Sequence, residues 1–291
     1  MQPFLSELGK KLAERWLMLL VVPGLGYCAA AVVAQALGHQ PADVLATVQA
    51  ELARLSAAAR KDPLLAVLSV LLASAGVALL ASAGSTAVRL LWLGNWPGTL
   101  GRPLLNYRIR RWDRWHRAYE TAVLAKRGGG VAPGSTPAAS LAVRRNRVGL
   151  VEPQRPTWIG DRFAAAQALV MAEYGVDLAV AWPRLWLLMS EEQRAELRVV
   201  WSAFTGAATL LAWGVLYGLL AAVSWPFLLL GAVPAVVAWR RGRLAAAAYA
   251  DLVESVVDLY LPGLADAMGV PPDTPPERAG RWLNRRMHKG T

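Results

Sequence analysis

The sequence predicts an all-α integral membrane protein with about four transmembrane helices arranged as two hairpins. Residues 199–239 contain no Asp, Glu, Lys or Arg, and Arg240, Arg241 and Arg243 follow directly. Two further uncharged stretches cover residues 16–38 and 63–88. A bilayer core of about 30 Å requires about 20 apolar residues per helical crossing, so these stretches have room for four spans.

The first predicted span covers residues 16–37. Lys10, Lys11 and Arg15 precede it, and Trp16 stands at its edge, where indole rings favour the headgroup level. A cleaved signal peptide is the alternative, because residues 28–31 are small. The apolar run is longer than the 7–15 residues usual in a signal peptide, which favours a retained anchor.

The remaining spans are predicted at 64–88, 200–222 and 224–239. The last one is short, so a re-entrant hairpin with the third span is an alternative to a full crossing. Between the first two spans lies a loop, residues 38–63, that reads as one amphipathic helix. Its apolar residues recur at helical spacing: Val44, Leu45, Val48, Leu52 and Leu55.

The distribution of basic residues predicts the orientation. Of the 31 Lys and Arg, 17 lie in residues 89–198 and eight in residues 240–291. The positive-inside rule therefore predicts that both termini are cytoplasmic and that only the loop 38–63 lies outside. The net charge of +11 has the same explanation, and no nucleic-acid-binding motif accompanies it.

The predicted organisation has four parts. An N-terminal hairpin covers residues 1–93, a basic cytoplasmic segment covers 94–198, and a second hairpin covers 199–239. The cytoplasmic tail, 240–291, is expected to contain a helix over about 243–261 and, beyond several prolines, a short helix over about 277–287. Gly and Pro residues predict a mobile linker at about 127–157.

The basic segment begins with a helical pattern rich in Arg and Trp. We expect this helix either to lie in the inner headgroup layer, where Arg reaches phosphates, or to pack on the acidic face of the tail helix, Asp251, Glu254 and Asp258. Its interface residues are Arg108, Arg110, Arg111, Trp112, Arg114, Trp115 and Arg117.

The second half of the basic segment is also predicted to be helical. Asp161 is placed to cap a helix that runs to about Tyr174. Ser190 and Gln193 form a capping box, and the helix that begins there is expected to continue unbroken into the third span.

Small residues recur every four positions in three of the spans. This spacing lets helix backbones approach one another in a bilayer, so it predicts either a tight bundle or a homo-oligomer. The residues are Gly26, Ala30 and Ala34, then Ser74, Ala78, Ser82 and Thr86, and finally Gly214, Gly218 and Ala222.

The sequence predicts no catalytic, cofactor or metal site. Gly24 to Ala29 matches a dinucleotide-binding pattern but lies inside a span, and the three tail carboxylates are too few oxygens for a hard cation. His116 near Asp113 is the one arrangement that would suit lipid chemistry, and it is weak.

Several motifs resemble a group of uncharacterised bacterial multi-pass membrane proteins. They are Pro156-Thr-Trp-Ile-Gly-Asp-Arg162, Tyr174-Gly-Val-Asp177, Trp182-Pro-Arg-Leu185 and the helix 248–260. Asp161 stands where the group has Asn, and Val257 stands where it has Phe. The resemblance implies that the segment 156–190 and the tail helix belong together on either side of one membrane hairpin, and it implies no activity. It also implies that the membrane is a bacterial inner membrane.

The resulting functional prediction is a non-enzymatic membrane anchor, scaffold or sensor that acts through a cytoplasmic helical module. Its expected partners are the lipid bilayer, anionic headgroups, a cytoplasmic protein and further copies of the chain. A homo-oligomeric channel lined by the stripe from Ser74 to Thr86 is the first alternative, and a lipid-modifying enzyme is the second.

Overall fold

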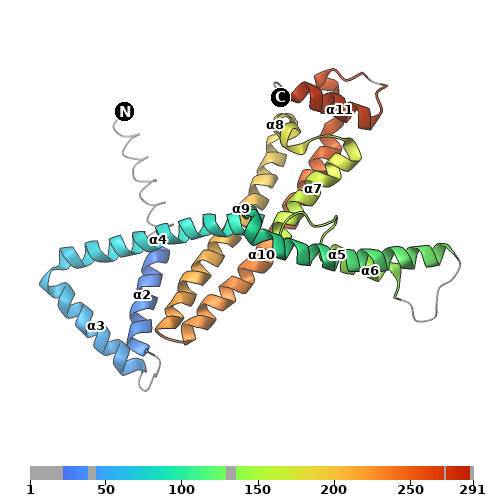
Figure 1. Cartoon of the computed structure of the whole chain (residues 1–291). Coiled ribbons are helices and arrows are strands. Elements are labelled where there is room, and N and C mark those ends of the chain that lie inside the picture. The colour runs from blue at the N-terminus through green and yellow to red at the C-terminus, as the bar shows by residue number, and fades with distance from the viewer. Residues whose placement is uncertain (1–21, 39–43, 129–135, 272, 289–291) are drawn as a thin grey trace, which may run out of the picture. The chain divides into compact units, whose positions relative to one another are not determined.

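The computed structural model describes residues 22–38, 44–128, 136–271 and 273–288. Over these ranges the chain forms ten α-helices and one short 3₁₀ helix, without a β-strand (Figure 1). The helices fall into two compact units. Unit 1 holds the described residues of Met1–Val88 and Gly206–Arg240, and unit 2 holds those of Arg89–Thr205 and Arg241–Thr291. The all-α prediction is confirmed.

Unit 1 contains α2 (Val22–Leu37), α3 (Val44–Lys61) and most of α4 (Pro63–Leu93). It also contains the second half of α9 (Glu191–Leu219), the 3₁₀ turn η2 (Leu220–Ala222) and the start of α10 (Pro226–Met268). The predicted loop helix is thus confirmed as α3, and α9 runs unbroken from the predicted capping box into the predicted third span.

Two helices are long and apolar enough to cross a membrane, Pro63–Leu93 and Glu191–Ala222. A third candidate arises if α7 (Trp158–Tyr174) and α8 (Leu178–Leu188), which are bent by 86°, are counted as one broken span. Helix α2 is shorter, and residues 16–21 of the predicted first span lie outside the described ranges. Two or three candidate spans are therefore found, and the predicted four are not confirmed.

Helix α10 differs from the prediction in length. It runs for 43 residues to Met268, so the predicted last span and the predicted tail helix are parts of one helix. Its uncharged part ends at Trp239, before Arg240, which leaves a short apolar segment. The predicted end of the tail helix at about residue 261 was wrong, because α10 continues past Pro262. The helix ends instead at Gly269, whose φ of +78° is one that glycine adopts at low cost.

Close backbone contacts in unit 1 occur where small residues meet. A Cβ at Gly24 would lie 2.2 Å from the carbonyl oxygen of Ser74, so α2 crosses α4 where neither has room for a larger residue. The buried face of α4 continues through Ala78, Ala81 and Ser85, whose hydroxyl lies 3.0 Å from that of Thr209. Small residues thus pack these helices, and among them Ser74 and Ala78 belong to the predicted stripes.

The predicted four-residue stripes are only partly buried. Ser82 and Thr86 are exposed, because the buried face of α4 follows a spacing of three and four residues, which the 3.6-residue helical repeat requires. Gly26 and Ala222 are exposed as well, whereas Ala34 is fully buried and Ala30 is half-buried.

Helices α9 and α10 approach most closely at three glycines. A Cβ on Gly231 would lie 2.6 Å from both the carbonyl oxygen of Gly214 and the Cα of Gly218. The contact therefore depends on the absence of a side chain at Gly231, and a Cβ on Gly214 would lie 3.0 Å from the Gly231 carbonyl oxygen.

Substitution of Gly231 by Leu is expected to force α9 and α10 apart. We expect a loss of about 2–3 kcal/mol, which corresponds to a Tm roughly 5–10 °C lower. The measurement is thermal unfolding of the purified chain in detergent, followed by tryptophan fluorescence. Gly76→Leu is the matched control, because nothing lies within 4 Å of a Cβ at Gly76. Equal melting of the two variants would contradict the expected collision.

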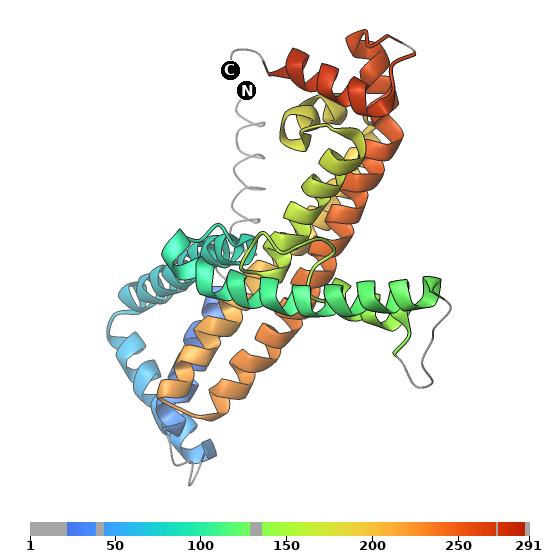
Figure 2. The same cartoon turned by 45° about the vertical axis from the view of Figure 1, so that its right-hand side comes forward.

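Unit 2 is built around a hydrophobic core shared by α7, α8, the start of α9, the end of α10 and α11 (Pro276–Met287). In both views α7 lies along α10 (Figures 1 and 2). Helix α5 (Gly98–Arg127) and helix α6 (Ala138–Asn146) pack side by side and form an arm of the same unit. The fully buried core residues include Val176, Ala181, Leu185, Val257 and Leu283.

One local prediction about unit 2 was correct and two were wrong. The capping box is present: Gln193 accepts a hydrogen bond from the Ser190 amide (2.9 Å), and Ser190 accepts one from the Gln193 amide (3.4 Å). The N-cap of α7 is Thr157, whereas Asp161 lies buried in the first turn. The predicted linker 127–157 contains α6 and a packed loop, and its residues 129–135 lie outside the described ranges.

Candidate functional site

The segment Thr157-Trp-Ile-Gly-Asp-Arg162 joins several elements of unit 2. Thr157 accepts a hydrogen bond from the Gly160 amide (3.1 Å) as the α7 N-cap and donates one to the Trp92 carbonyl oxygen (2.5 Å). A Cβ on Gly160 would lie 2.2 Å from the Leu93 carbonyl oxygen. The start of α7 is therefore held directly against the end of α4.

Asp161 organises the loop that precedes α7. Its Oδ1 accepts hydrogen bonds from the amides of Gln154 (2.8 Å) and Arg155 (3.4 Å), and its Oδ2 pairs with Arg108 at 3.0 Å. The same guanidinium donates to the Val148 carbonyl oxygen at 2.6 Å. Burial lowers the pKa of Arg108, and the neighbouring carboxylate of Asp161 opposes that shift. This buried ion pair connects α5, the loop and α7.

Arg162 holds the acidic face of α10. Its guanidinium donates to Asp251, and to Glu254 Oε1 at 2.8 Å, although the Arg162 side chain itself is 7% exposed. The third tail carboxylate, Asp258, accepts a hydrogen bond from the Tyr174 hydroxyl at 2.9 Å. The prediction that the Arg108–Arg117 helix is the partner of this face was therefore wrong, because α7 occupies the position beside α10.

A small cavity lies beside this ion-pair network. Its volume is about 220 Å³, and Asp161, Arg162 and Asp251 line it together with Trp158 and Asn146. Arg243 stacks on Trp158 with its guanidinium carbon 4.1 Å from the ring centroid, and burial lowers its pKa. The charged groups that line this cavity are already paired within the chain, Arg162 with Asp251 and Asp161 with Arg108, so this cavity is a structural junction.

Helix α11 packs against the C-terminal end of α7, at the turn that leads to α8. Asn284 donates to the Gly175 carbonyl oxygen (2.8 Å) and accepts from the Asp177 amide (2.9 Å), so one side chain binds both ends of the turn between α7 and α8. Gly280 packs on the Tyr174 carbonyl oxygen without space for a Cβ. Leu283 and Met287 are buried beneath. Gly175 adopts a φ of +64° at this turn.

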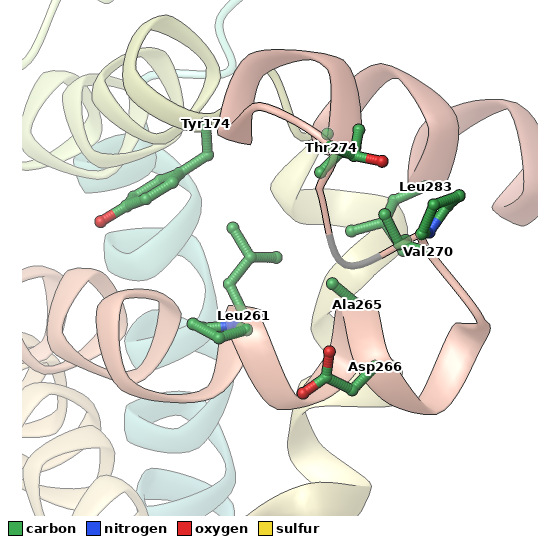
Figure 3. Close-up of a pocket in the computed structure, with 11 residues that line it drawn as sticks. Tyr174, Leu261, Ala265, Asp266, Val270, Thr274 and Leu283 are labelled. Carbon is green, nitrogen blue, oxygen red and sulfur yellow. The ribbon is translucent and has the colours of Figure 1, made fainter.

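An apolar pocket of unit 2 lies between the end of α10, α11 and Tyr174 (Figure 3). Its volume is about 270 Å³. The carboxylate of Asp266 stands at its edge, and Thr274 lies across from it (Figure 3). We call it the elbow pocket; its apolar lining consists of Leu261, Pro262, Ala265, Val270, Pro271 and Leu283. Pockets for drug-sized ligands span roughly 300–1,000 Å³, so this one matches one or two side chains better.

The α5–α6 arm carries a concentration of positive charge. Residues 98–147 contain eleven Lys and Arg but two Asp and Glu. Arg110, Arg111, Arg114 and Arg117 are exposed, as predicted for a headgroup-binding face, whereas Arg108 is buried against Asp161.

The two predicted interface tryptophans face the interior of the arm. Trp112 is buried, donates to the Gly149 carbonyl oxygen and stacks on His116. Trp115 lies under Arg144, whose guanidinium carbon is 5.1 Å from its ring. Both rings therefore serve the contact with α6 and its flanking loop.

The remaining candidates show no catalytic geometry. His116 lies 3.4 Å from Glu120 and 3.5 Å from Arg145 rather than beside Asp113. Among the residues described, no group of three or more His, Cys, Asp or Glu is placed to hold a metal ion. The dinucleotide-like pattern at Gly24 lies inside helix α2, and Cys28 contacts Ser74 at 3.8 Å.

Sequence reasoning missed the partners of Arg162 and the role of Asn284. The Arg162 and Asn284 side chains each bind residues about 90 to 110 positions away in the chain, and a single sequence carries no periodic signal for such pairs. The one available signal was the motif that ends in Asp161 and Arg162. Comparison of the chain with protein-family models, curated proteins and solved structures gave no match.

Proposed function

We propose that this protein is a non-enzymatic membrane anchor that presents a helical docking module to the cytoplasm. The apolar helices α4 and α9 support the membrane anchor, since both are long and apolar enough to cross a bilayer. The excess of basic residues in 89–198 and 240–291 supports a cytoplasmic location for unit 2 in a bacterial inner membrane.

The elbow pocket is the observation that carries the docking function. It is an apolar pocket on unit 2, and its size fits the side chains of a protein segment. Asp266 is exposed at its edge, and Asp258 is bound to Tyr174, which lines the same pocket. The chemistry therefore suits a partner segment that inserts an apolar side chain and carries a Lys or Arg next to it.

Photocrosslinking tests this proposal. With p-benzoylphenylalanine at Val270 of the full chain in native membranes, we expect one discrete adduct. Ala265→Trp should fill the pocket and reduce the adduct at least about tenfold, and Asp266→Asn should reduce it about threefold, as expected for a buried anchor and a rim charge.

Leu244→Trp is the matched control for Ala265→Trp. It adds the same ring to α10 at an exposed position outside the pocket, and it should leave the adduct unchanged. An adduct that survives Ala265→Trp, or the absence of any adduct, would reject the pocket as a docking site.

A further inference from the structure

The α5–α6 arm has a face on which arginine and apolar side chains are both exposed. Leu100, Leu104, Tyr107, Arg111 and Arg114 follow one another at spacings of three and four residues, which places them on one side of α5. Leu100 is 70% exposed and Tyr107 is 59% exposed. Trp115 lies at the edge of this face and Trp112 lies beside it, and both pack on α6 and its flanking loop.

The arginines of this face are available to bind a ligand. The intramolecular partner that the sequence suggested for them, the acidic face of α10, is occupied by Arg162. Arg108, at the edge of the series, is buried and pairs with Asp161. Arg110, Arg111 and Arg114 are exposed to solvent. A strongly positive surface that the described part of the chain leaves unneutralised attracts an anionic partner.

The position of the arm in the chain identifies the class of that partner. Helix α4, a candidate span, ends at Leu93, and α5 begins five residues later at Gly98. The start of α5 therefore lies at the boundary of any bilayer that α4 crosses. Exposed Leu and Tyr beside Arg suit the headgroup and acyl boundary, whereas a nucleic acid backbone would leave these apolar side chains in water.

We propose that α5 lies along the cytoplasmic leaflet and binds anionic lipid headgroups through Arg110, Arg111, Arg114 and Arg117. Leu100, Leu104 and Tyr107 insert at the level of the upper acyl chains. The arm then reports the anionic lipid content of the leaflet, because each arginine near an anionic surface strengthens binding roughly fivefold. This binding is independent of the elbow pocket.

A fluorescence-quenching experiment on the full chain tests the proposal. Thr121 lies on the same exposed face as Arg114, about 35 Å along α5 from Gly98. A bimane label on Thr121→Cys, in a Cys28→Ala background, approaches the bilayer only if α5 lies flat on it. Nanodiscs would contain a lipid with a doxyl quencher near the headgroup, in pure phosphatidylcholine or with about 30% phosphatidylglycerol.

We expect at least about threefold stronger quenching with phosphatidylglycerol than without it, and a decrease at about 0.5 M salt, since exposed charges are then screened. Substitution of Arg110, Arg111 and Arg114 by Gln should abolish the dependence on phosphatidylglycerol. The matched control replaces Arg278, Arg281 and Arg285, three exposed arginines of α11, by Gln and should retain it.

Three results would overturn the proposal. The first is equal quenching in the two lipid mixtures. The second is an equal loss with both triple variants, which would indicate a general effect of net charge. The third is a short RNA that displaces the labelled arm from phosphatidylglycerol nanodiscs and also binds the unmodified chain at least tenfold more tightly than the arm triple variant. That result would assign the face to nucleic acid.

Discussion

Replacement of Asp161 by Ala is expected to destabilise unit 2 by about 3–5 kcal/mol, because it leaves the buried charge of Arg108 without its partner. It also removes the acceptor for the Gln154 and Arg155 amides, so the loop before α7 loses its attachment. Thermal unfolding of the full chain in detergent, followed by tryptophan fluorescence, should show a Tm lower by roughly 8–15 °C.

Two further variants make this result specific. Asp161→Asn keeps an oxygen that accepts from the two amides but turns an NH2 donor toward Arg108, so it loses the ion pair while it retains the loop contacts and should cost less than Asp161→Ala. Glu173→Ala removes an exposed carboxylate from the same helix and should change the Tm little. If Asp161→Ala and Glu173→Ala have the same Tm, the buried pair of Arg108 and Asp161 does not stabilise unit 2.

Substitution of Gly160 by Ala is expected to have the second-largest effect. The added Cβ would lie 2.2 Å from the Leu93 carbonyl oxygen and 2.9 Å from the Thr157 hydroxyl. Because the first contact is with backbone, α7 must move away from the end of α4, and the Thr157–Trp92 hydrogen bond is lost with it. We expect the free energy of unfolding to fall by about 3 kcal/mol, measured as a decrease in Tm by the thermal unfolding experiment described above.

Gly206→Ala is the control for this substitution. Gly206 lies in α9 with nothing within 4 Å of its Cβ position. Alanine favours the helix over glycine by about 0.8–1.0 kcal/mol, so this variant should melt at an equal or higher temperature. Destabilisation of both variants to the same extent would show that the close approach at Gly160 is not the cause.

Local features of the fold were predictable because each depends on residues close together in the chain. The capping box of Ser190 and Gln193, the helix α3 and the end of α7 at Tyr174 follow from side chains within one or two turns. Errors arose where distant residues decide. Asp161 resembles an N-cap in sequence, but Arg108, 53 residues earlier, draws it into a buried pair, and Thr157 caps instead.

The same reason explains the partial success at the candidate sites. The exposed arginines of α5 could be predicted from composition and helical spacing, because exposure requires no partner. The elbow pocket could not, since its walls come from Tyr174, the end of α10 and α11, which meet only after folding. Nor could the length of α10 be predicted, because its packing against α7 and α11 carries the helix past Pro262.

By itself, the sequence determined that this protein is helical, that it has segments long and apolar enough to cross a membrane, and that its positive charge is concentrated outside them. These properties follow from composition and short-range periodicity, which act along a single helix. Only the tertiary structure decided that Arg162 rather than the arm neutralises the acidic face of α10. The reason is steric as well as electrostatic: Gly160 lets α7 start directly on the end of α4, and from there Arg162 reaches Asp251 and Glu254.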